Sequence, residues 1–227
     1  MIAFIRQTLV IAHKDLRAEL RTKEALNASL SFALVILLLF SFAFDPSVEE
    51  TRLISGGLLW IVFAFAGALI LNRSFAREQP NDCLDALVAA PISRAALLLG
   101  KILANFALLV AVELVSFPVF GIFYNVQWAR QFWPLMLVVA MGTWGVTVIG
   151  TMFSALTVNI RLREVMLPLL VYPLMIPGLM ASMQLTTHLV NGGAFAGDVL
   201  IWARLLVAFD AVFTALALVL IEQVLVG

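Results

Sequence analysis

The sequence predicts an all-α integral membrane protein with six transmembrane helices, preceded by an N-terminal amphipathic helix at the membrane interface. Of the 227 residues, 63% are hydrophobic and 12% are charged, whereas a soluble domain has about 45–50% apolar and about 25% charged residues. The charged residues also gather in short blocks between long apolar runs. Such a chain has too few polar residues to cover a soluble core, so a soluble globular protein is excluded.

Six apolar runs are long enough to cross a bilayer, which takes roughly 20 residues of helix. They are Ala25–Phe44, Leu53–Asn72, Ile102–Tyr124, Phe132–Leu156, Glu164–Gln184 and Leu200–Ile221. None shows the strict alternation of a transmembrane barrel strand, which would also be about half as long. We therefore expect an interfacial helix over residues 1–24 and a six-helix transmembrane domain over residues 25–227.

The distribution of basic residues predicts the topology, because cytoplasmic loops carry an excess of Lys and Arg. Eleven of the 14 basic residues lie in the N-terminal segment and in the connections after the second and fourth spans, and three lie in the other connections. The eleven are Arg6, Lys14, Arg17, Arg21, Lys23, Arg73, Arg77, Arg94, Lys101, Arg161 and Arg163, and the three are Arg52, Arg130 and Arg204. Both termini are therefore predicted to be cytoplasmic.

The N-terminal segment has the pattern of an amphipathic helix. Its apolar residues recur at spacings of three and four and are Ile2, Ile5, Leu9, Ala12, Leu16 and Leu20. The basic residues lie elsewhere on the helical wheel, which favours a helix on the inner leaflet with its basic side toward anionic lipid headgroups. The alternative is a helix that packs on a cytoplasmic partner.

The fifth apolar run contains Pro168, Pro173 and Pro177, each of which removes a backbone donor. We therefore do not expect an unbroken helix here. Irregular backbone at membrane depth requires protein or a water-filled cavity to satisfy it. The run is interpreted either as a bent or re-entrant element near a translocation pathway or as a kink that serves packing.

Two acidic residues, Glu113 and Asp210, fall well inside predicted spans. A charge at the bilayer centre costs a few kcal/mol or more, so such residues usually face a cavity or a partner, or stay protonated. Two hypotheses remain open for each residue. It lines a transport pathway, or it forms a hydrogen-bonded contact between helices or subunits.

The sequence contains no pattern typical of catalysis. The segment Leu97–Ile102 includes Gly-Lys, but Ala95 stands where a phosphate-binding loop has its first glycine, and no Ser or Thr follows the lysine. The histidines, His13 and His188, lie on opposite sides of the membrane in the predicted topology and cannot share a metal or haem iron. A single cysteine, Cys83, excludes an internal disulfide. We expect no enzymatic activity, no cofactor or metal held by this chain, and no nucleic-acid partner.

The connection over residues 73–101 is too long for a tight helical hairpin. Asn81 or Asp82 can cap a short helix over Cys83–Ala89, which Pro91 then ends. That helix carries apolar residues on one side and acidic residues on another, a pattern that favours docking into a groove of another protein.

The amino-acid sequences of four segments resemble those of a known family. The segments are GLLWIVFAFAGALILNRSFARE (Gly57–Glu78), CLDALVAAPISRAALLLGK (Cys83–Lys101), the end of the third span with Pro118, and LTVNIRLREVMLPLLVYPLMIPGLM (Leu156–Met180). Together they resemble the B-subunit permease of the cytochrome c maturation system, the haem exporter membrane subunit of an ABC transporter. The resemblance covers nearly the whole chain, although the acids in the third and sixth spans are not part of the family pattern.

The resemblance implies an ABC-2-like (type V exporter-like) permease of the inner membrane. It also implies a separate cytoplasmic ATPase chain that binds ATP, a haem-handling membrane subunit, a small single-span subunit and a periplasmic haem chaperone, with haem as the cargo. Closure of the ATPase pair would displace the short helix in the connection, and the flanking spans would transmit the movement. The residues implied in this coupling are Glu78, Cys83, Leu84, Asp85, Leu87 and Pro91.

Other functions remain open at this point. An ABC-2 exporter permease for a drug, lipid or polysaccharide would have the same architecture. An ion-coupled transporter would be expected to show inverted repeats and paired charges in the membrane, and the chain shows no clear repeat. Two copies of the chain at a shared pore, or one copy paired with another membrane subunit, both fit the sequence.

Overall fold

A computed structural model describes residues 2–45, 48–78, 91–124, 131–157 and 163–224. Within these ranges all the regular structure is helical, which confirms the all-α fold class. The elements are α1 (Ile2–Thr22), α2 (Glu24–Ala43), α3 (Glu49–Leu71), the 3₁₀ helix η1 (Ala76–Glu78), α5 (Arg94–Phe123), α6 (Phe132–Thr157), α7 (Arg163–Val190) and α8 (Val199–Val224).

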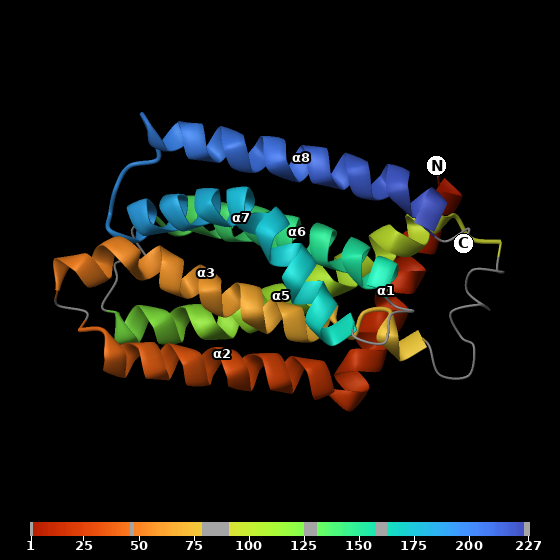
Figure 1. Cartoon of the computed structure of the whole chain (residues 1–227), viewed down its shortest axis with the longest axis horizontal. Helices are drawn as coiled ribbons and strands as arrows, with labels where there is room; N and C mark the ends of the chain where they lie inside the picture. Colours follow the sequence, from red (N-terminus) through yellow and green to blue (C-terminus); the bar gives the residue numbers. More distant parts are fainter. Residues whose placement is uncertain (1, 46–47, 79–90, 125–130, 158–162, 225–227) are drawn as a thin grey trace.

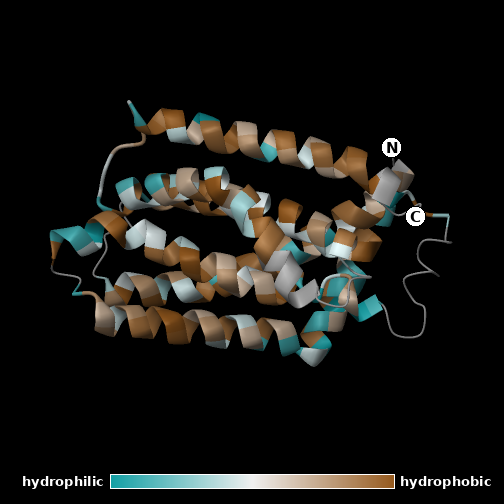
Figure 2. Cartoon of the chain, in the orientation of Figure 1, coloured by the Kyte–Doolittle hydropathy of each residue, from teal (hydrophilic) through white to brown (hydrophobic). Residues whose placement is uncertain are grey.

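Six of these helices, α2, α3 and α5 to α8, are long and apolar enough to cross a membrane. They match the six predicted runs, and the largest differences are at the start of α5 and the end of α7. Helix α5 begins at Arg94, well before the predicted Ile102, and α7 continues to Val190, past the predicted Gln184. The six helices lie along the long axis of the molecule (Figure 1), and their residues are mostly hydrophobic (Figure 2).

Helix α1 lies across one end of the bundle, and both termini lie at that same end (Figure 1). Hydrophilic residues are frequent in α1 and in the short segment that follows α3 (Figure 2). The end of α3 reaches the same region, so the N-terminus, the segment after α3 and the C-terminus share one side of the bundle, as the topology requires. That this side is cytoplasmic remains a prediction.

A helix is present over the predicted N-terminal segment as α1, and its apolar residues are divided between two surroundings. That α1 lies at the membrane interface stays a prediction. Ile5, Leu9 and Leu20 are more than half exposed, at 52%, 57% and 56%, as expected for side chains that face lipid. Ile11 and Ala12, by contrast, are buried. Helix α1 therefore packs on the protein as well as presenting an apolar surface.

Close packing of α3, α6 and α7 forms the centre of the bundle. Trp60 is fully buried, and its indole nitrogen donates a hydrogen bond to Thr186 Oγ1 at 2.9 Å. Gly142 on α6 lies against the indole ring, because a Cβ atom built there would come within 2.1 Å of Trp60 Cη2. Small residues of this kind allow membrane helices to approach closely, and polar side chains then bond across the contact.

The three prolines of the fifth span all lie inside α7, which runs without a break from Arg163 to Val190. The expectation of a broken helix is therefore wrong, and Figure 1 shows that α7 bends along its length instead. Membrane helices tolerate proline where neighbouring helices and local adjustments satisfy the freed backbone groups. One such close neighbour is α8, since a Cβ atom on Gly178 would meet the Phe209 ring at 2.6 Å.

We expect Gly142→Ala to lower the stability of the protein by about 1–3 kcal/mol, the usual range for overpacking. The added methyl group would displace the Trp60 ring and strain its hydrogen bond to Thr186. Thermal unfolding in detergent measures the change. Gly57→Ala is the matched control, because a Cβ atom at Gly57 has no neighbour within 4 Å. Equal melting temperatures for the two variants would contradict this packing.

Candidate functional site

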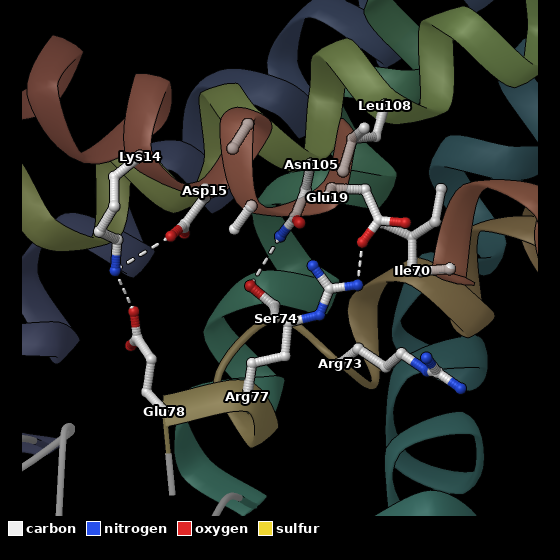
Figure 3. Close-up of a pocket in the computed structure, with 13 residues that line it drawn as sticks. Lys14, Asp15, Glu19, Ile70, Arg73, Ser74, Arg77, Glu78, Asn105 and Leu108 are labelled. Carbon is white, nitrogen blue, oxygen red and sulfur yellow. Dashed lines mark hydrogen bonds and ion pairs between the residues drawn. The ribbon is translucent and has the colours of Figure 1, made fainter. Parts of the chain in front are cut away.

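Four side chains of alternating charge meet where α1, η1 and α5 come together, and we call them the ionic cluster. Lys14 and Asp15 lie on α1, Glu78 ends η1, and Lys101 lies in the second turn of α5. The Lys14 ammonium is 3.1 Å from Asp15 Oδ1 and 2.5 Å from Glu78 Oε1. Lys101 Nζ is 3.1 Å from Asp15 Oδ2 and 3.0 Å from Glu78 Oε2. Each carboxylate therefore bridges both lysines, and Figure 3 shows the two contacts of Lys14.

Lys101 is the most deeply buried member, with 1% of its side chain exposed. A buried charge is tolerated only where it is paired and hydrogen-bonded. Besides the two carboxylates, the carbonyl oxygen of Ser74 accepts a hydrogen bond from Lys101 at 2.8 Å. The ring of Phe75 lies 4.6 Å below the ammonium, within the range of a cation–π interaction. The segment after α3 thus supplies three of the groups around this lysine.

Lys14 is the more accessible lysine of the cluster, with 46% of its side chain exposed. Burial of the rest of the side chain would lower the pKa of Lys14. The hydrogen bond to Glu78 and the negative charge of Asp15 outweigh this effect, so the pKa lies above its ordinary value. Lys14 therefore stays charged throughout the physiological range.

A second ion pair lies beside the ionic cluster and joins α1 to η1. Glu19 is fully buried, and its carboxylate pairs with Arg77 of η1 (Figure 3). The other carboxylate oxygen accepts a hydrogen bond from the backbone nitrogen of Leu26 at 2.8 Å. Helices α1 and α2 meet at Lys23, whose φ angle of 57° is left-handed. Glu19 thus holds a tight corner between the two helices.

Three members of the ionic cluster, Lys14, Asp15 and Glu78, border a cavity of about 430 Å³ together with the Glu19–Arg77 pair (Figure 3). Its walls come from α1, the start of α2, the end of α3 with η1, and α5. On one wall Asn105 donates hydrogen bonds to Ser74 Oγ and to Thr151 Oγ1 of α6, both at 2.9 Å. The polar contacts therefore continue from α1 through α5 into the interior of the bundle.

The predicted coupling residues are only partly described. Cys83, Leu84, Asp85 and Leu87 lie outside the described residues. Glu78, predicted as a docking residue, is only 7% exposed, and its carboxylate belongs to the ionic cluster.

Pro91, on the far side of that gap, is exposed, and its carbonyl oxygen accepts a hydrogen bond from Gln7 of α1 at 3.3 Å. Ser93 N donates to Gln7 Oε1 at 3.5 Å. Helix α1 therefore contacts the chain on both sides of the segment over residues 79–90.

The two deep acids lie against different faces of α6. Thr143 donates a 2.6 Å hydrogen bond to Glu113 Oε1, and Glu113 lines a cavity of about 180 Å³ between α5 and α6. Asp210 on α8 faces Gly145, where an added Cβ atom would lie 2.7 Å from Oδ1. Thr143 and Gly145 are two residues apart, so they point in different directions from the helix. The structure therefore does not bring the acids together at one site.

Glu113 and Asp210 each keep one buried oxygen with no hydrogen-bond partner among the described residues. In the same part of the chain, no group of three or more His, Cys, Asp or Glu side chains could hold a metal ion. His188 Nε2 lies 2.9 Å from the carbonyl oxygen of Ala194, a contact that closes the turn after α7.

The predicted site residues did not include Lys101, Asp15, Glu19 or Arg77. A signal was present: Lys14 and Asp15 place opposite charges side by side in the N-terminal helix, and the connection between the second and third spans carries residues of both charges. Which of these charges pair depends on how α1 folds back onto α5, and helical periodicity carries no information about that packing.

Fold and site together define a multi-pass membrane protein whose N-terminal helix is joined by buried charges to the connection between α3 and α5. The chain matches the family described as CcmB protein over residues 6–224 and belongs to that family. It is similar to three proteins that are each named "Heme exporter protein B". That of Rhodobacter capsulatus is 30% identical over 179 residues, which cover 79% of this chain and 82% of the relative.

The relative from Paracoccus denitrificans is 28% identical and covers 90% of this chain and 91% of its own length. The relative from Pseudomonas aeruginosa is also 28% identical, with 91% and 92% covered. These matches confirm the family that the sequence segments indicated.

Replacing Glu19 with Ala is expected to destabilise the protein by about 1–3 kcal/mol, because it leaves the backbone nitrogen of Leu26 without its acceptor and removes the carboxylate that pairs with Arg77. Glu24→Ala is the matched control: it breaks an exposed pair with Arg73, and such pairs contribute about 0–1 kcal/mol. Thermal unfolding of both variants in detergent measures the difference. A similar loss in both would show that the buried pair is not the stronger contact.

Proposed function

We propose that this chain is the membrane-spanning permease subunit of an ABC transporter complex for cytochrome c maturation. It couples ATP hydrolysis by a separate cytoplasmic ATPase chain to haem transfer or export, or to release of a loaded periplasmic haem chaperone. Membership of the CcmB protein family supports this proposal, as do relatives named "Heme exporter protein B" that match over most of their length. The chain itself acts as a transport component, and ATP binds to the partner.

One structural observation supports the coupling step: helix α1 contacts the chain on both sides of the segment over residues 79–90. The ionic cluster holds Glu78, and Gln7 binds Pro91. A force that the ATPase applies to this segment would therefore reach α1 and α5 directly. We propose that Cys83, Leu84, Asp85 and Leu87 contact the ATPase, while Glu78 and Pro91 anchor the segment to the bundle.

The proposed assembly follows from this arrangement. The protein lies in the inner membrane with both termini cytoplasmic, which puts α1 and the segment after α3 on the side of the ATPase. Its membrane partners are a haem-handling subunit and a small single-span subunit, and haem is the cargo that the complex serves. A second copy of this chain would complete the transmembrane part of the complex if no other membrane subunit pairs with the first copy.

The coupling proposal is tested by Leu84→Asp combined with Leu87→Asp in a chain co-expressed with its candidate ATPase. We expect the wild-type chain to retain the ATPase through purification and to support ATP hydrolysis. The double variant should reach the membrane at the normal level and lose the ATPase, because two charged side chains cannot enter an apolar groove. Co-elution and the rate of ATP hydrolysis are the measurements.

The control for this experiment is Arg17→Asp, which changes the net charge by the same two units at an exposed position of α1. It should retain the ATPase. Failure of the wild-type chain to hold any ATPase, combined with solute transport by the chain alone in vesicles, would reject the ABC assignment. Loss of the ATPase in the control as well would attribute the effect to net charge and remove the segment from the interface.

A further inference from the structure

We propose that α1, η1 and the first turns of α5 move as one lever, and that Lys101 is the positioning residue that holds this lever together. The inference rests on the proposed function, in which an ATPase acts on the segment over residues 79–90. It adds a role for α1 and for a buried lysine that no family pattern in the sequence analysis assigned. Lys101 touches neither ATP nor cargo, so its effect is transmitted through the charges that it binds.

The ionic cluster joins three elements through a closed ring of contacts. Lys101 of α5 binds both Asp15 of α1 and Glu78 of η1, and Lys14 of α1 binds the same two carboxylates. Breaking a single contact leaves every member attached through another. Lys101 is 1% exposed and Glu78 only 9% exposed at the side chain, so solvent and salt screen these contacts far less than a surface pair.

One face of α1 holds both ends of the segment over residues 79–90. Gln7 and Lys14 are seven residues apart, which places them on the same side of the helix at a separation of about 10 Å along its axis. Lys14 binds Glu78 at one end, and Gln7 binds Pro91 at the other end. The distance between these ends is therefore fixed by the length of two helical turns.

Backbone packing beneath the ionic cluster makes this connection stiff. Gly100 directly precedes Lys101, and a Cβ atom at Gly100 would lie 2.7 Å from Ile11 Cβ and 2.8 Å from the carbonyl oxygen of Thr8. The two helices are thus in contact without an intervening flexible side chain. Helix α1 cannot shift along α5 without breaking this packing and the ionic cluster together.

The lever continues from α5 toward the middle of the bundle. Asn105 lies one turn beyond Lys101 on α5 and donates to Thr151 of α6 and to Ser74 at the end of α3. These bonds join the moving end of α5 to the two most buried spans, α3 and α6. A displacement at residues 78 and 91 therefore has a continuous path of packed and bonded groups into the helices that surround the deep acids.

The first test uses Lys101→Met in the full complex with its ATPase and the other subunits. We expect ATPase binding and the rate of ATP hydrolysis to stay within about twofold of wild type, because the segment over residues 79–90, which is proposed to contact the ATPase, is unchanged. The yield of haem-stained c-type cytochrome in cells should fall at least tenfold, which separates coupling from docking. Arg73→Met is the matched control, since it removes a cation from an exposed pair with Glu24 and should leave the yield within twofold.

A second variant separates transmission from folding, because Lys101→Met alone leaves two carboxylates facing one lysine. Lys101→Met with Glu78→Gln removes one positive and one negative charge, so we expect near-normal membrane levels and melting temperature. This variant should hydrolyse ATP and still fail to mature cytochrome c. If the folded double variant gives the same yield of cytochrome c as the wild-type chain, the proposed lever is wrong. Failure of the wild-type chain to bind an ATPase would instead reject the proposed function on which the lever rests.

Discussion

The burial of one ammonium group governs the architecture at the end of the bundle where the chain begins. Lys101 has almost no contact with solvent, so it needs compensating charge and hydrogen-bond acceptors around it. No single element supplies them all: Asp15 comes from α1, Glu78 from η1, and the carbonyl of Ser74 from the segment after α3. The lysine thus requires α1 and the segment after α3, which includes η1, to converge on α5, and this convergence determines where α1 lies.

Polar side chains inside the bundle also need partners, although most of them are uncharged. Hydrocarbon provides no hydrogen-bond partners, so polar side chains within the spans must find them on neighbouring helices. The bonds from Trp60 to Thr186, from Asn105 to Thr151 and from Thr143 to Glu113 all cross between helices. Each contributes only about 0.6–2 kcal/mol, but each also selects one rotation of its helix against the next. Specific polar contacts, supported by close glycine packing, therefore fix an arrangement that hydrophobic burial alone would leave undetermined.

How well the sequence predicts a feature of this structure depends on how far apart in the chain the interacting residues lie. Local apolar length predicts the six spans, and apolar spacings of three and four predict the amphipathic α1, because both are properties of continuous stretches. The prolines of α7 predict irregularity, and the structure accommodates them in a bent helix because neighbouring elements supply contacts that the local sequence does not specify. Glu78 was assigned to docking from its position in a motif, whereas its carboxylate is held by lysines 64 and 23 residues away along the chain. Pairings over such distances follow from the fold of α1 onto α5, which periodicity cannot reveal.

Helix α1 combines two constraints that act on opposite sides. Ile5, Leu9 and Leu20 are exposed, and in the predicted interfacial position they would enter the headgroup layer. Its other side carries Lys14 and Asp15, whose positions are set by the ionic cluster. Helix α1 stays attached to α5, because the ionic cluster and the packing of Gly100 against Ile11 hold the two helices together. Helix α1 and the start of α5 are therefore expected to move together, which is the property that the proposed lever requires.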